Sequence, residues 1–188
     1  MKNIKKIILP FLLIIIFSFN TSCSTNNMKP EDFKNKEPRL IIENYLSGNV
    51  KAWGVLQNRS GKVIRQFSAE LNGKWDGKQL ILDEIFNWDD GEIQKRQWQI
   101  NKIDENNYEG TAGDVVGKAK GYSYGPAFKF EYVLLVPVKG KEIKITFDDW
   151  IFKQDERVAI NRATMTKFGF KVAAVSYTHL TLPTKDSV

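Results

Sequence analysis

Chemically reactive side chains are scarce in this sequence. Its 188 residues include one histidine, His179, and one cysteine, Cys23. A serine or cysteine nucleophile needs a basic partner beside it, and a zinc site needs several histidine or cysteine ligands. The sequence therefore predicts no metal site and no cofactor, and it favours a binding protein over an enzyme.

Carboxylates and arginines are the polar groups that a site would have to use. Asp148 and Asp149 are neighbours in the segment 147–150, so in a strand their side chains face opposite ways. Only one of them can point into a protein interior, where a buried carboxylate needs a partner. The residues on other segments that could join it are Arg65, Glu84, Arg96 and Arg162.

Three interpretations of this cluster stay open. It could grip the polar head of a ligand inside an apolar cup, form ion pairs that close the fold, or carry acid–base catalysis by an aspartate together with Glu84. The ion-pair network is the plainest of the three. As a ligand site, the cluster would consist of Arg65, Glu84, Arg96, Phe130, Tyr132, Asp149 and Arg162.

The elements that must position these groups are strands. From Val50 to Phe170 the apolar residues recur with a period of two, and no stretch shows a convincing 3.6-residue helical period. Eight such segments follow one another, separated by turns such as 58–61, 89–91 and 139–141. The pattern predicts an all-β fold, an antiparallel up-and-down meander.

A sheet of this size tends to close, because closure removes its exposed edges. We therefore predict a lipocalin-like barrel of about 8–9 strands. Within it, the glycine-rich segment 108–122 is interpreted as one bulged and strongly coiled strand. The aromatic residues could fill the interior or line a cavity, and the pattern is the same in both cases because both need inward apolar faces.

The first residues indicate secretion. Lys2, Lys5 and Lys6 precede an apolar run at 7–19, which is too short for a comfortable membrane-spanning helix. A basic start followed by a short apolar run is typical of a signal peptide.

Cys23 stands where a bacterial lipoprotein would carry its acyl chains. We predict a lipoprotein signal peptide over 1–22, a lipidated Cys23 and a polar tether over 23–45. Ser24 after the cysteine, in place of Asp, favours the outer membrane with the domain facing the periplasm. An ordinary signal peptide with an idle cysteine is the alternative.

The end of the chain departs from the strand pattern. The segment "VSYTHLTLPT" (175–184), translated back into DNA, looks like a transposon end joined to a sequencing adapter. We interpret 175–188 as adapter-derived and 46–174 as a barrel domain without its natural C-terminus. His179 is then no site, and we expect a missing last strand and an open edge beside the first one.

Charge does not point to a nucleic-acid partner. The formal net charge is +6, but basic and acidic residues are interspersed along the body of the chain. Nucleic-acid binding needs clustered lysine and arginine. The partners we expect are a membrane, through the lipid anchor, and a lipid or fatty-acid ligand.

Several stretches resemble a bacterial lipoprotein family known as domain of unknown function 3833. They include "KAWG" (51–54), "DDGE" (89–92), "YEGTAGDVVG" (108–117), "FDDW" (147–150) and "NRATMTKFGF" (161–170). The resemblance covers about residues 28–172 and implies a secreted lipoprotein, but it supplies no activity and no catalytic residues.

A weaker likeness, at the level of the fold, is to lipocalin and calycin barrels. It implies Trp53 on the first strand, with Arg162 from a late strand packed across it.

These inferences lead to one expectation and one alternative. We expect a membrane-anchored periplasmic lipoprotein that binds a small apolar or amphipathic ligand, such as a lipid, in a β-barrel cup. The alternative is a structural or interaction lipoprotein of the cell envelope, with a filled barrel and no ligand.

Overall fold

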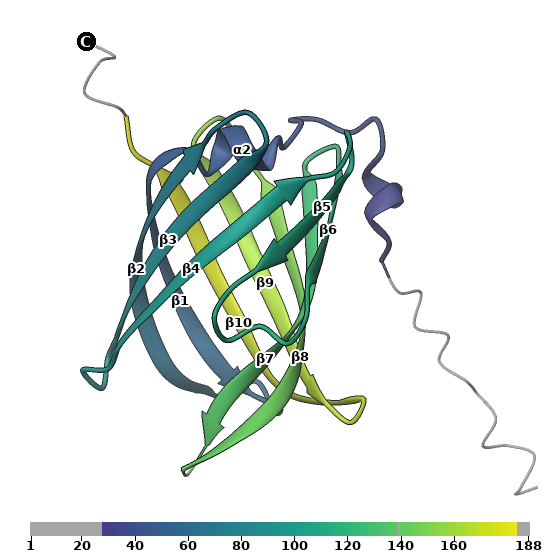
Figure 1. Ribbon diagram of the computed structural model, residues 1–188. Coiled ribbons are helices and arrows are strands. Elements are labelled where there is room, and N and C mark those ends of the chain that lie inside the picture. The colour runs from purple at the N-terminus through teal and green to yellow at the C-terminus, as the bar shows by residue number, and fades with distance from the viewer. Residues whose placement is uncertain (1–27, 139, 184–188) are drawn as a thin grey trace, which may run out of the picture.

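The period-two pattern forms ten antiparallel strands in the computed structural model, which describes residues 28–138 and 140–183. Each strand pairs with its neighbours in sequence, and β10 also pairs with β1, so the sheet closes into a barrel (Figure 1). The strands are β1 (Gly48–Asn58), β2 (Val63–Trp75), β3 (Gln79–Trp88), β4 (Ile93–Lys102), β5 (Asn107–Thr111), β6 (Ala119–Tyr124), β7 (Ala127–Val138), β8 (Lys141–Lys153), β9 (Val158–Lys167) and β10 (Phe170–Thr181).

Helical structure in the described residues is limited to η1 (Pro30–Phe33) and α2 (Ile42–Tyr45), both before the first strand. None of the helices described is long and apolar enough to span a membrane. The predicted signal peptide and Cys23 lie outside the described residues.

The closed antiparallel barrel is confirmed, but the expected number of about 8–9 strands is wrong. The glycine-rich segment, expected as one bulged strand, forms two short strands, β5 and β6, joined by 112–118. Turn residues in this connection break the strand, and Gly117 has a positive φ of 74° that suits glycine. The tenth strand is β10.

β10 fills the edge that we expected to find open. Its pairing with β1 runs from Val50 opposite Thr181 to Asn58 opposite Ala173. The interpretation of 175–188 as adapter-derived stays a prediction. The expectation of an open edge beside β1 is wrong, because β10 pairs there. An alternating stretch of sufficient length can pair with β1 whatever its origin, because the ladder bonds use backbone atoms.

Two buried polar side chains on β9 and β10 lack hydrogen-bond partners among the described residues. They are Asn161, through both atoms of its amide, and His179, through Nδ1. Burial lowers the pKa of His179 to about 4, so its imidazole is neutral at physiological pH. Unpartnered buried groups are rare in natural cores, and both of these lie on the last two strands of the barrel.

The end of the barrel near α2 is closed by the N-terminal segment. Leu40, Ile42 and Leu46 are buried in the main core cluster at this end, against inward residues such as Leu80 and Ile100. Ser123 Oγ donates a hydrogen bond of 2.9 Å to the Leu40 carbonyl. The plug is thus attached through both apolar burial and a polar contact.

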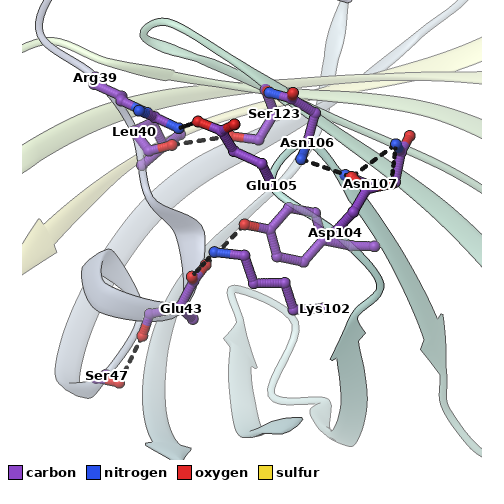
Figure 2. A network of polar contacts seen from close by, with 11 residues as sticks. Arg39, Leu40, Glu43, Ser47, Lys102, Asp104, Glu105, Asn106, Asn107 and Ser123 are labelled. Carbon is purple, nitrogen blue, oxygen red and sulfur yellow. Dashed lines mark hydrogen bonds and ion pairs between the residues drawn. The ribbon is translucent and has the colours of Figure 1, made fainter. Parts of the chain in front are cut away.

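A buried ion pair lies under this plug (Figure 2). Glu43 accepts hydrogen bonds from Lys102 Nζ at 2.6 Å and from Tyr108 Oη at 2.9 Å. Burial alone would raise the pKa of Glu43, but these hydrogen bonds outweigh it and lower the pKa. Glu43 therefore fixes α2 to β4 and β5 as a charged carboxylate.

Replacing Lys102 should test this contact. Lys102→Met leaves the Glu43 carboxylate buried without its cation, so we expect a loss of about 3 kcal/mol in the free energy of unfolding at neutral pH. Lys95→Met removes an exposed lysine from the same strand and should change stability by less than about 0.5 kcal/mol. Urea unfolding of both variants measures the difference, and equal losses would contradict the role given to Glu43.

Candidate ligand-binding cup

The half of the barrel away from α2 is hollow. A cavity of about 370 Å³ opens at this end, which carries the turns between β1 and β2, β3 and β4, β7 and β8, and β9 and β10. Its walls are mostly apolar and aromatic, with a few polar groups. The lining residues used below are Arg65, Phe86, Trp88, Arg96, Asp114, Tyr132, Phe147, Asp149, Met165 and Tyr177. We call this cavity the cup.

Aromatic side chains form the floor of the cup. The rings of Tyr132 and Phe147 stack with centroids 5.0 Å apart, and Trp98 packs edge-on against Tyr132 at 5.2 Å. Below them, Phe128 and Phe130 continue the row along β7, and only a void of about 60 Å³ remains. The barrel is therefore filled in its closed half and hollow in its open half.

Arg96 is the central charge in the wall. Its guanidinium donates to both carboxylate oxygens of Asp114, from Nε at 3.1 Å to each and from Nη2 at 2.7 Å to Oδ2. Its Nη1 lies 3.8 Å from Glu84 Oε2 on the paired strand. The charge of Arg96 is thus largely balanced by Asp114, which comes from the β5–β6 connection.

Burial disfavours the charged form of Glu84 more strongly than the charge of Arg96 favours it. Burial raises its pKa to about 7, against the opposing effect of the Arg96 charge, and the nearby Asp149 raises it further. A carboxyl group in this state is partly protonated near neutral pH. It can then donate a hydrogen bond as well as accept one.

Asp149 carries an unused hydrogen-bonding position. Tyr132 Oη donates to Asp149 Oδ2 at 3.0 Å, while Oδ1 is buried and has no partner in the described part of the chain. Burial raises the pKa of Asp149 to about 6, with the Tyr132 hydrogen bond and the neighbouring Asn161 amide acting in the other direction. A buried oxygen without a well-formed hydrogen bond costs free energy.

Arg65 stands at the mouth of the cup. Its Nη2 contacts Asp90 at 2.6 Å and Glu92 at 2.9 Å, and its guanidinium lies over the Trp88 ring at 4.0 Å. Its Nε is buried and has no partner among the described residues. The Arg65 guanidinium is thus held at the mouth by two carboxylates and a tryptophan ring.

The structure brings together most of the predicted site residues. Arg65, Arg96, Tyr132 and Asp149 line the cup. Glu84 and Phe130 lie just below it, around the small void. Asp149 points inward and Asp148 outward toward Lys129, as the alternation of a strand requires.

The prediction that Arg162 belongs to the ligand site is wrong. It is exposed, because its neighbours Asn161 and Ala163 occupy the inward positions of β9. Trp53 is also on the outer face, since Ala52 takes the inward position of β1. Trp53 does lie on the first strand, but both it and Arg162 are on the outer face, so Arg162 cannot join the inward Asp149 or line the cup.

Sequence reasoning missed Asp114 and Tyr177. Asp114 sits in an irregular connection, and nothing in its local pattern indicates that it reaches Arg96 across the mouth. Tyr177 falls in the segment interpreted as adapter-derived, which excludes it from the predicted site. Within the described residues, no group of three or more His, Cys, Asp or Glu side chains could hold a metal ion.

The raised pKa of Glu84 predicts a pH dependence of stability. The folded state keeps a proton that the unfolded chain loses near the ordinary glutamate pKa of 4.5, so this contribution is lost as pH rises through about 7. Glu84→Gln should therefore gain stability over the original chain, and the gain should be larger at about pH 8 than at about pH 5. Denaturant unfolding at both pH values measures it.

The matched control is Asp83→Asn, which changes an exposed carboxylate on the same strand. Its effect should be similar at both pH values. A Glu84→Gln difference that stays constant or shrinks as pH rises would contradict the buried, proton-retaining state.

Comparisons with known proteins place the fold. An S-type phycobiliprotein lyase, CPES from Guillardia theta, matches with a TM-score of 0.56 and 10% identity over 85% of this chain and 96% of its own. A protein of unknown function from the DUF3598 family of Nostoc punctiforme PCC 73102 matches with a TM-score of 0.58 and 15% identity, over 78% of this chain and 51% of its own. At these identities the likeness concerns the fold alone.

None of the curated proteins compared with the chain matches it. One protein family does match, over residues 17–179 and thus over most of the sequence. The chain belongs to the family described as protein of unknown function (DUF3833).

Proposed function

We propose that this protein binds one small amphipathic ligand in the cup. The observation that carries the proposal is a hollow, mainly apolar end of the barrel whose wall also contains the polar side chains of Arg65, Arg96 and Asp149. Pockets with apolar walls and a few convergent polar groups are the usual form of small-molecule sites.

The size of the cup limits the ligand. A volume of about 370 Å³ lies at the lower end of the range for ligand pockets, which runs from about 300 to 1,000 Å³. The aromatic floor formed by Tyr132 and Phe147 blocks access to the closed half. The ligand therefore has a single medium-length chain or a small ring system, and a whole two-chain lipid does not fit.

The charges of the wall favour a neutral head group. Arg96 is balanced by Asp114, and Arg65 by Asp90 and Glu92. Among the described residues that line the cup, no cation is left over to neutralise a ligand carboxylate. Asp149 at the floor would also repel one whenever it is ionised. A hydroxyl head group avoids this repulsion and can still donate hydrogen bonds to polar side chains of the wall, so an alcohol of medium chain length or a similar neutral amphiphile fits better than a fatty-acid anion.

The cellular setting belongs to the same proposal. A lipidated Cys23 would hold the barrel at the outer membrane, facing the periplasm, within reach of apolar compounds in the bilayer. This part rests on the sequence of the first 23 residues. A filled, ligand-free envelope protein is the competing function, and the packed closed half of the barrel is the feature that favours it.

Titration with decanol and decanoate tests the proposal. We expect the segment that follows Cys23 to bind about one equivalent of decanol by calorimetry, and to bind decanoate at least about tenfold more weakly near neutral pH. Met165→Trp places a large side chain in the cup and should abolish binding. Thr146→Trp adds the same side chain to an exposed position of β8 and should leave binding unchanged.

Circular dichroism and urea unfolding of both variants show whether each is folded, since overpacking can itself cost about 1–3 kcal/mol. Failure of the folded original chain to bind either compound would overturn the proposal and favour the filled-barrel function. Binding that survives in a folded Met165→Trp variant would place the ligand outside the cup.

A further inference from the structure

The turn between β9 and β10 exposes two phenylalanines at the open end of the barrel. The side chains of Phe168 and Phe170 are 88% and 77% exposed. Apolar side chains exposed next to one another on a protein surface often mark a site that contacts a membrane or another protein. Neither ring contributes to the core cluster.

The backbone at this turn adopts a conformation that phenylalanine disfavours. Phe168 has a φ of 52° and Gly169 a φ of 81°, the pair of left-handed residues that a tight hairpin requires. Glycine, asparagine or aspartate suits the first of these positions, and a bulky residue is disfavoured there. The chain thus places an aromatic ring at a strained position where folding gains nothing from it.

Cations surround the two rings. Lys167 and Lys171 flank the turn, and Lys167 Nζ lies 5.3 Å from the centre of the Phe168 ring. The neighbouring turns in the barrel add Arg59 and Lys62 on one side and Lys141 on the other. None of these five cations forms an ion pair within 28–138 and 140–183.

Further apolar side chains are exposed at the open end of the barrel, in the rim that the turns form around the mouth of the cup. These exposed side chains are Val63 and Ile64 at the start of β2, Val138 at the end of β7, and Val172 two residues after Phe170. Asp90 and Glu92 lie at the β3–β4 turn, where Arg65 holds them, and Glu142 lies beside Lys141 at the start of β8. The rim is therefore mainly apolar and cationic over the turns of β7–β8, β9–β10 and β1–β2, and acidic over β3–β4. We call the apolar and cationic part the aromatic rim.

We propose that the aromatic rim docks onto the surface of a bilayer containing anionic lipids, with Phe168 and Phe170 inserted between the head groups. Aromatic rings settle at the head-group level of membranes, and lysines next to them reach lipid phosphates with their ammonium groups. The docked barrel would have its cup open toward the bilayer. This inference goes beyond the proposed function and holds whether or not the cup binds a ligand.

The predicted anchor is compatible with this orientation. η1 lies outside the barrel wall (Figure 1). Its Phe33 packs against Trp150 and Phe152. The chain between Cys23 and Pro30 can reach about 25 Å when extended. That reach is close to the height of a barrel with tilted strands of about ten residues.

A local fluorescent reporter tests the docking in the full chain. In a Cys23→Ser background, the dye NBD is attached at Val172→Cys beside the two phenylalanines. On vesicles of phosphatidylcholine and phosphatidylglycerol we expect its emission to shift to shorter wavelength and brominated lipid chains to quench it. The shift should be smaller on phosphatidylcholine alone and should weaken with added salt.

A second reporter controls for membrane attachment through the apolar leader at 7–19. NBD at Glu156→Cys lies in the β8–β9 turn at the closed end and should keep its emission in buffer. Phe168→Ser with Phe170→Ser should abolish the shift at position 172. Ile103→Ser, which changes an exposed apolar residue at the closed end, should leave it intact.

The two dye positions separate the outcomes. Equal shifts at positions 172 and 156, or none at 172 while the chain sediments with the vesicles, would overturn the docking, and the aromatic rim would then be free for a protein partner. A shift at position 172 that survives the double serine variant would also overturn it, because the phenylalanines would not be the inserted groups. Circular dichroism of the double variant should match the parent, since both rings are exposed.

Discussion

The width of the barrel determines how much of its interior the side chains can fill. Ten strands enclose more space than eight, and side chains from the walls alone do not fill it. This chain fills one half with a row of aromatic rings on β7 and a plug from the N-terminal segment. Within the described residues the other half has no such plug, and the cup follows from that asymmetry.

The same asymmetry explains where the charges lie. At the closed end, Glu43 and Lys102 compensate each other under the plug, and Tyr108 completes the carboxylate's hydrogen bonds. In the cup wall, Arg96 is shared between Asp114 and Glu84, while Asp149 accepts a hydrogen bond from Tyr132 and lies beside the Asn161 amide. The Glu43 carboxylate is hydrogen-bonded and charged, whereas Glu84 and Asp149 have raised pKa values and are partly protonated near neutral pH. A structural ion-pair network and an incomplete polar site thus coexist in one barrel, although the sequence presents them as alternatives.

Strand periodicity carries most of what can be predicted. It leads to the closed antiparallel barrel and the inward faces of β2, β3 and β7, because a period of two determines which residues share a face. It fails where side chains meet through loops, as Asp114 meets Arg96, since no periodic pattern exists there. Arg162 is expected among the partners of the inward aspartate because of its charge, whereas alternation with the inward Ala163 places it outside. The count of strands depends on a glycine-rich stretch whose break into β5 and β6 is decided by pairing with β4 and β7.

A cup at one end, beside an apolar and cationic rim, suits a protein that takes its ligand from a membrane. Mass spectrometry of the organic extract of the purified chain would detect a ligand that the cup carries from the cell. We expect one small neutral amphiphile, with a single chain or ring system and near one equivalent per protein. An extract without such a compound, from a folded protein that also leaves added amphiphiles unbound, would rule out the ligand-binding role.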